Sequence, residues 1–156
     1  MPCGSTRVTK PYRAAAAGPK PGTSALTGRC FCKAIRYRCG PLLYPPTLCH
    51  CESCRRAAGA HAVGWLTVQR GDLSWIGSAP QEFESSPGVH RAFCGRCGTP
   101  LTYRSATRPE EIDVTICSLE QPELAPPVDH IWMQDAPSWD RPGDGLAQHG
   151  AARKPP

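Results

Sequence analysis

The sequence predicts a single all-β domain, and the prediction rests on length, composition and the spacing of strand-forming residues. A chain of 156 residues is the size of one domain with one hydrophobic core. Its 15 glycines and 18 prolines favour short strands joined by many turns over long helices. From residue 26 onward, short segments of β-forming residues alternate with turn residues, as in an all-β domain.

Strands are predicted wherever such a segment lies between turn residues. The clearest example alternates Ile112, Val114 and Ile116 with polar residues, which is typical of a strand with one buried face. One short helix is predicted over residues 52–60, because its arginines and alanines favour a helix that Gly59 can end. The eight predicted strands are 26–32, 34–39, 61–68, 73–76, 81–84, 89–93, 100–103 and 112–117.

The net charge of +5 comes from the ends of the chain. Residues 1–24 mix Pro, Gly, Ala and basic residues without hydrophobic periodicity, which predicts a disordered basic leader. Residues 148–156 are expected to form a flexible tail. Six of the 18 basic residues lie in 1–24 and 151–156, which leaves 12 against 13 acidic residues in the body. A nucleic-acid partner is therefore not expected.

Ten cysteines in a short chain indicate either a disulfide scaffold or metal sites, depending on the compartment. No export signal and no apolar run of transmembrane length is visible in the sequence. We therefore expect a cytoplasmic protein with no membrane association and with reduced cysteines. Reduced, clustered cysteines favour metal binding.

Seven of the ten cysteines fall in three clusters, and close pairs of thiolates are what tetrahedral zinc requires. In the last cluster, Gly95 and Gly98 allow positive φ angles, so the backbone can wrap around an ion. The alternative is a set of buried or redox cysteines without metal. The clusters are Cys30-Phe31-Cys32, Cys49-His50-Cys51-Glu52-Ser53-Cys54 and Cys94-Gly95-Arg96-Cys97.

The seven ligands divide as four plus three, which predicts two zinc ions. The two pairs need each other to complete one closed, structural tetrahedron, whose ligands would be Cys30, Cys32, Cys94 and Cys97. The remaining cluster brings three sulfurs by itself and leaves one position open, where zinc performs chemistry. This candidate catalytic site consists of Cys49, Cys51 and Cys54.

Several neighbouring side chains have two possible roles. His50 could be a fourth ligand that closes the open site, although its ring would compete with the flanking thiolates for one short arc of backbone. Arg55 and Arg56 could attract a carboxylate-bearing substrate or simply solvate a helical turn. The remaining histidines and cysteines of the body are expected to be structural, with the cysteines buried on strands: His61, His90, His130, Cys39 and Cys117.

These motifs resemble the glutathione-dependent formaldehyde-activating (GFA) enzyme family, which includes centromere protein V. The family patterns Gly-x-Cys-x-Cys, Cys-His-Cys-x-x-Cys-Arg and Phe-Cys-x-x-Cys-Gly-Thr correspond to Gly28–Cys32, Cys49–Arg55 and Phe93–Thr99. The segment His130-Ile131-Trp132 and the later Trp139 and Asp144-Gly145-Leu146 are similar to the family's closing segment. The resemblance covers residues 25–147, which we expect to be one zinc domain.

The resemblance implies a zinc-stapled β-tent of small antiparallel sheets, with a structural zinc on the residues matching the two pairs and a catalytic zinc on those matching the three-cysteine cluster. It also implies a carbon–sulfur lyase that joins a small thiol, glutathione, to formaldehyde or a related small aldehyde. Two alternatives remain open, a non-catalytic zinc-binding interaction module and a carrier of thiols or zinc. The oligomeric state is not predicted.

Overall fold

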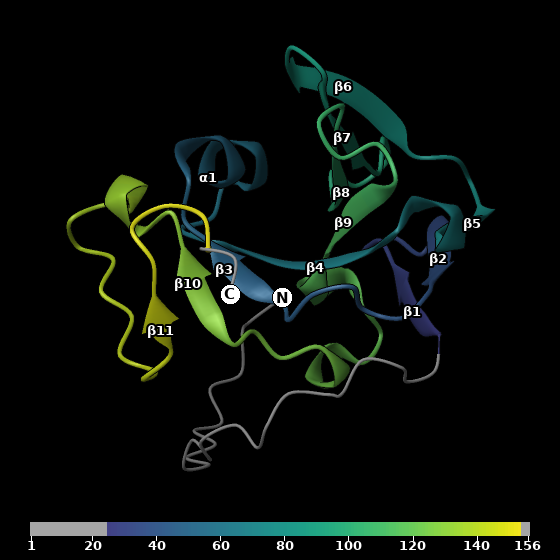
Figure 1. Ribbon diagram of the computed structural model, residues 1–156. Coiled ribbons are helices and arrows are strands. Elements are labelled where there is room, and N and C mark those ends of the chain that lie inside the picture. Colours follow the sequence, from purple (N-terminus) through teal and green to yellow (C-terminus); the bar gives the residue numbers. More distant parts are fainter. Residues whose placement is uncertain (1–24, 154–156) are drawn as a thin grey trace, which may run out of the picture.

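The structure is a computed structural model that describes residues 25–153 (Figure 1). The predicted leader, residues 1–24, lies outside the described residues, as do residues 154–156. The described elements are β1 (Leu26–Arg29), β2 (Ile35–Cys39), β3 (Thr47–Cys49), α1 (Glu52–Ala58), β4 (Val63–Gln69), β5 (Ser74–Gly77), β6 (Gln81–Ser86), β7 (Val89–Phe93), β8 (Pro100–Ser105), β9 (Glu111–Thr115), β10 (Asp129–Ile131) and β11 (Ala147–Gln148), with short 3₁₀ turns at Arg70–Asp72, Ile116–Ser118, Pro122–Leu124 and Met133–Asp135.

The strands form two sheets, which confirms the predicted all-β fold. One sheet has the order β1-β2-β5, and the other has the order β11-β10-β3-β4-β9-β8-β7-β6. All pairs are antiparallel except β10 with β3 and β10 with β11. Figure 1 shows α1 above the large sheet, between β10 on one side and the β6–β7 hairpin on the other.

The main core lies where the two sheets meet, and the side chain of Tyr37 shows how closely they pack. Tyr37 is buried in β2, and its hydroxyl lies 2.6 Å from the hydroxyl of Ser118. Gly28 of β1 is in contact with the same ring, since a Cβ atom there would lie 2.2 Å from it. Only glycine therefore fits at this point of β1 without displacing the ring.

The predicted helix is confirmed with its predicted end. Cys51 is the N-cap of α1, and Gly59 ends the helix in the left-handed region with φ 61°. The prediction for Cys39 is also confirmed, since this residue is buried in β2. The prediction for Cys117 is wrong, because the chain leaves β9 for a 3₁₀ turn and this turn exposes Cys117.

The C-terminal residues 148–153, expected to be a flexible tail, contact the body. Ala147 and Gln148 form β11 beside β10. The guanidinium of Arg153 donates to both carboxylate oxygens of Asp129, at 2.6 and 2.8 Å. Burial would raise the pKa of Asp129, but hydrogen bonds from Arg153 and then Thr47 outweigh burial and lower it.

Within residues 25–153, no helix is long and apolar enough to cross a membrane.

Candidate metal centres

The first candidate metal centre is formed by four sulfur atoms from two distant turns, and we call it the four-cysteine cluster. Its Sγ atoms all lie within 4.8 Å of one another. The Sγ–Sγ distance is 3.6 Å from Cys30 to Cys32 and 3.7 Å from Cys32 to Cys94. Zinc–sulfur bonds of about 2.3 Å place tetrahedral sulfurs about 3.8 Å apart. The set Cys30, Cys32, Cys94 and Cys97 therefore fits a closed zinc site.

Two tight turns present these sulfurs. In the turn between β1 and β2, Lys33 has a φ of 64° and its amide donates to the Cys30 carbonyl at 3.0 Å. In the turn between β7 and β8, Gly98 has a φ of 75° and its amide donates to the Cys94 carbonyl at 2.8 Å. The positive φ predicted for Gly98 is confirmed, whereas Gly95 does not adopt one.

Hydrogen-bond donors surround this cluster, as thiolate ligands require. The amide of Ile35 donates to the Sγ of Cys30 at 3.3 Å. The hydroxyl of Thr99 lies 3.2 Å from the Sγ of Cys97 and also accepts from the amide of Phe31 at 3.0 Å. The Thr99 hydroxyl, followed by backbone amides, lowers the pKa of Cys97 to about 5. Thr99 thus connects the two turns and stabilises a thiolate in one of them.

The second candidate metal centre, the three-cysteine cluster, is built around the start of α1. Cys49 ends β3, Cys51 caps the helix, and Cys54 lies in its first turn. Their Sγ atoms also lie within 4.8 Å of one another. The amide of Cys54 donates to the Sγ of Cys51 at 3.4 Å, so the cap itself turns this sulfur toward its neighbours. Three convergent thiols could hold a metal and leave one ligand position for another molecule.

His50 does not join this cluster, because both of its ring nitrogens have other partners. Its Nδ1 lies 2.8 Å from the Asp140 carboxylate, and its Nε2 lies 2.8 Å from Nδ1 of His130. Asp140 also contacts Nδ1 of His61 at 3.1 Å, and His130 contacts Asp144 at 3.0 Å. The network fixes the backbone between Cys49 and Cys51.

Burial and hydrogen bonding together set the pKa values of the side chains within this network. Burial lowers the pKa of His50, although the Asp140 carboxylate opposes this effect. Burial would raise the pKa of Asp140, but hydrogen bonds from His61 and then His50 outweigh it and lower the pKa. The network therefore keeps a carboxylate charge beside the His50 ring. The donor atoms of His50, His61 and Asp140 lie within 4.8 Å of one another, and the contacts between the two rings and the carboxylate account for this proximity.

Arg91 is a candidate site residue that the sequence analysis missed. It lies on β7 and is 6% exposed, and its Nη1 and Nη2 atoms lie 3.8 and 3.6 Å from the Sγ of Cys54. Its Nε donates to the hydroxyl of Ser85 at 3.2 Å, and its guanidinium carbon lies 5.0 Å from the ring centre of Tyr103. Hydrogen bonds from the other two cysteines, and then the charge of Arg91, lower the pKa of Cys54 to about 2. The cluster thus has a buried positive neighbour.

The two arginines that follow the cluster have structural contacts. Arg55 donates to the backbone carbonyls of His50 at 3.1 Å and Asp135 at 3.0 Å. Arg56 pairs with Glu52 at 2.7 Å on the exposed face of α1. Arg55 therefore connects α1 to the segment that follows β10, and Arg56 solvates the helix.

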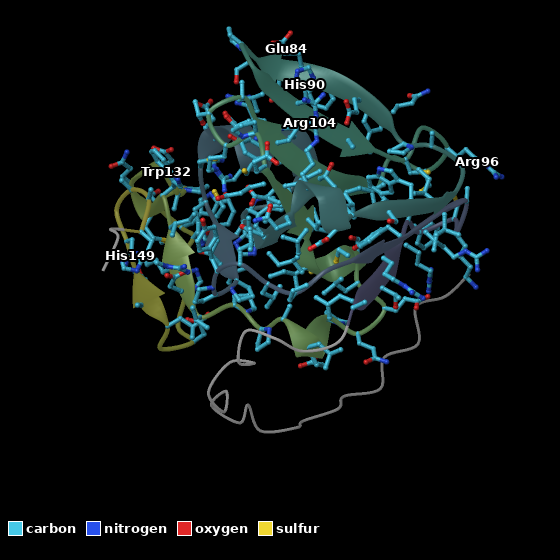
Figure 2. The ribbon with its side chains drawn as sticks, turned by 45° about the vertical axis from the view of Figure 1, so that its right-hand side comes forward. Glu84, His90, Arg96, Arg104, Trp132 and His149 are labelled. Carbon is cyan, nitrogen blue, oxygen red and sulfur yellow. The ribbon has the colours of Figure 1, made fainter. Side chains whose placement is uncertain are left out.

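A cavity of about 820 Å³ opens over the three-cysteine cluster, and we call it the groove. Figure 2 shows Trp132 on the β10 side of this region, with His90 and Arg104 on the side of β7 and β8. Trp132 has a φ of 60°, an unfavourable conformation for a tryptophan, at the position where it lines the groove. The lining includes Cys49, Cys51, Cys54, Arg91, Arg108 and Arg153. None of the four-cysteine ligands lines it.

Metal analysis of the purified protein under zinc-replete conditions is expected to find two zinc ions of unequal affinity. Four thiolates enclose one ion, whereas three thiolates leave the other exposed to the groove, so a chelator should remove the second ion first. Cys54→Ser should retain only the slowly released ion. A single tightly held ion, with none recoverable at the second position, would contradict this expectation.

Comparison with known proteins finds a matching family model and relatives with similar sequences. Residues 25–135 match the sequence model of the family described as "Glutathione-dependent formaldehyde-activating enzyme". A Halomonas elongata protein, provisionally named a glutathione-dependent formaldehyde-activating enzyme, is 30% identical over 124 residues, which are 73% of this chain and 78% of that protein. An uncharacterized lyase of Schizosaccharomyces pombe is 32% identical over 78 residues, which are 49% of this chain and 55% of that protein.

A solved structure shares the fold. The crystal structure of a Rhodobacter sphaeroides protein superimposes with a TM-score of 0.55 at 21% identity, and the match covers 80% of this chain and 99% of that one. At this identity the likeness concerns the fold alone.

Proposed function

This chain belongs to the glutathione-dependent formaldehyde-activating enzyme family, and from this membership we propose that it is a zinc-dependent carbon–sulfur lyase that adds glutathione to formaldehyde or a related aldehyde. The observation that carries the proposal is the position of the three-cysteine cluster. All three of its thiols line the groove, so a molecule bound there can reach them. The four-cysteine cluster differs, because its four sulfurs can fill every position of a tetrahedral ion and none of its residues lines the groove.

The three sulfur donors fit zinc, which prefers thiolate ligands and tetrahedral geometry. When bound at such a site, zinc supplies an open position that favours the thiolate form of an incoming thiol at neutral pH. The contribution of the chain's own residues is to bind the thiol and the aldehyde next to each other. Holding two reactants in contact is itself a large part of catalysis.

The walls of the groove suit a molecule with both charges, such as glutathione. Arg108 and Arg153 line the groove, where a carboxylate of the ligand would share guanidiniums that already pair with acidic side chains of the chain. Asp135 also lines the groove and can accept from an ammonium group. The volume of about 820 Å³ is within the usual range for small-molecule sites.

Arg91 is placed to act on the reacting atoms. In the addition, the thiol sulfur forms a bond to the carbonyl carbon, and the π electrons of the carbonyl move to its oxygen, which then takes up a proton. The guanidinium of Arg91 lies beside Cys54 at the bottom of the groove. A buried positive charge at this point would stabilise the negative charge that develops on the oxygen.

Exchange spectroscopy by NMR tests the proposal at equilibrium. The zinc-loaded protein is expected to accelerate exchange between free formaldehyde plus glutathione and their hydroxymethyl adduct. The acceleration should be largest at mildly acidic pH, where free glutathione has little thiolate, and should shrink toward the usual thiol pKa of about 8.5.

The controls are zinc-free protein and Cys49→Ser at the same concentration, because the uncatalysed addition is itself appreciable. Cys117→Ser removes an exposed thiol outside both clusters and should behave as the wild type. An exchange rate equal to that of the zinc-free protein across the pH range would reject the formaldehyde assignment.

A further inference from the structure

A second cavity, of about 340 Å³, lies against Cys54 and Arg91. Both residues, together with Trp65, line this cavity and the groove, so the two spaces adjoin at these three side chains. The cavity lies between α1, β4 and the β6–β7 hairpin. We call it the apolar chamber, and its hydrophobic lining includes Ala58, Val63, Trp65, Phe83, Phe93 and Pro100.

The chamber and the groove differ in chemistry. The groove is lined by several charged side chains, whereas most side chains around the chamber are aliphatic or aromatic. The rings of Phe83 and Phe93 pack edge to face with centroids 6.0 Å apart. Phe83 is 45% exposed, which places a large apolar side chain at the boundary between chamber and solvent. A cavity of this volume and lining binds uncharged hydrocarbon groups.

Neither proposed reactant has a group that uses such a chamber. Glutathione is charged at both ends, and formaldehyde has a single carbon. A larger aldehyde differs, because its carbonyl carbon carries a substituent that must lie beside the point of attack. The Cys54 side chain borders both spaces, so a carbonyl group placed there would direct its substituent into the chamber and leave the thiol in the groove.

We infer that the apolar chamber binds the hydrocarbon or aromatic substituent of the aldehyde, so that the chain's preferred electrophile is larger than formaldehyde. This inference rests on the proposed function. The reaction remains an addition: the thiol sulfur bonds to the carbonyl carbon, the oxygen receives the proton lost by the thiol, and the substituent is unchanged. The product is a hemithioacetal.

A series of aldehydes tests the inference. Hemithioacetal formation with glutathione is measured for formaldehyde, propanal, pentanal and benzaldehyde, each relative to its own uncatalysed rate. The relative kcat/KM is expected to rise from formaldehyde to pentanal by about threefold to fourfold for each methylene group buried in the chamber. Equal or falling values along the series would overturn the inference.

A substitution that fills the chamber gives the second measurement. Ala58→Phe is expected to lower the ratio of pentanal to formaldehyde activity at least about tenfold, because the new ring occupies the space of about 340 Å³. Ala60→Phe, at an exposed position outside both cavities, is the matched control and should keep the wild-type ratio. An unchanged ratio in folded Ala58→Phe would overturn the inference.

Binding of an unreactive probe separates the two proposals. The probe is 4-fluorobenzyl alcohol, observed by fluorine NMR, and it should bind the wild type and Ala60→Phe but not Ala58→Phe. Acceleration of formaldehyde addition without probe binding would overturn the chamber and leave the proposed function intact. Probe binding without acceleration of any aldehyde would overturn the proposed function, and the aldehyde assignment with it.

Discussion

Cys94→Ser is expected to unfold the domain or to lower its melting temperature drastically, whereas Cys54→Ser should leave it folded. Cys94 is buried in the main core, and its sulfur meets that of Cys32, 62 residues away. A structural zinc contributes an apparent ~10–16 kcal/mol to folding, compared with a total stability of about 5–15 kcal/mol for an ordinary domain. Loss of one ligand would therefore remove a large share of the stability.

The expected tolerance of Cys54→Ser follows from the local character of its cluster. Its three cysteines lie within residues 49–54, so their sulfurs do not connect distant segments. Thermal melts followed by circular dichroism compare both variants with Cys117→Ser, which removes an exposed thiol. If Cys54→Ser melted well below Cys94→Ser, the structural and reactive roles would have to be exchanged.

Arg91→Met is expected to lower the catalysed rate of glutathione addition by about 10- to 100-fold. Methionine keeps much of the side-chain volume but removes the positive charge 3.6 Å from the Cys54 sulfur. A hydrogen bond involving a charged group contributes about 1.5–3 kcal/mol, which corresponds to this range of rates. The loss should fall on kcat more than on KM, because the charge acts on the oxygen that becomes negative during the addition.

Two further variants distinguish charge from packing at this position. Arg91→Lys should restore part of the rate, since a charge without the planar fork is still favourable. Arg38→Met removes an exposed arginine of β2, in the other sheet, that lines neither cavity, so its rate should equal that of the wild type. A wild-type rate for Arg91→Met, at unchanged zinc content, would exclude Arg91 from the reaction.

The fold could be predicted wherever a strand is long enough to show its pattern. β9 and β4 have alternating or continuous apolar residues, and both were predicted within a few residues of their ends. β3, β10 and β11 were missed because each has only two or three residues, too few for any period to show. Such short strands form because neighbouring strands of the sheet supply their hydrogen-bond partners. Those neighbours are distant in sequence, so the local residue pattern cannot reveal the strand.

The candidate site likewise contains some residues that could be predicted from the sequence and others that could not. The cysteine clusters could be recognised because ligands two or three residues apart in sequence are necessarily close in space. Arg91 and Asp140 could not, since their partners Cys54 and His50 lie 37 and 90 residues away. A buried arginine and a surface arginine look alike in a sequence, and only the folded chain shows which one faces a sulfur.

The different spans of the two clusters also set an order of assembly during synthesis. The three thiols of residues 49–54 close a very short loop, for which the entropy cost is small. The four-cysteine cluster cannot form until residue 97 has been added, and at ~5–20 residues per second the ribosome needs about 2–9 s to extend the chain from Cys54 to Cys97. At the end of those seconds the nascent chain has the thiols of Cys30, Cys32 and residues 49–54 but still lacks β8, β9 and β10 of the large sheet. The segment with the three thiols that later line the groove is therefore synthesised before the large sheet that surrounds it can be completed.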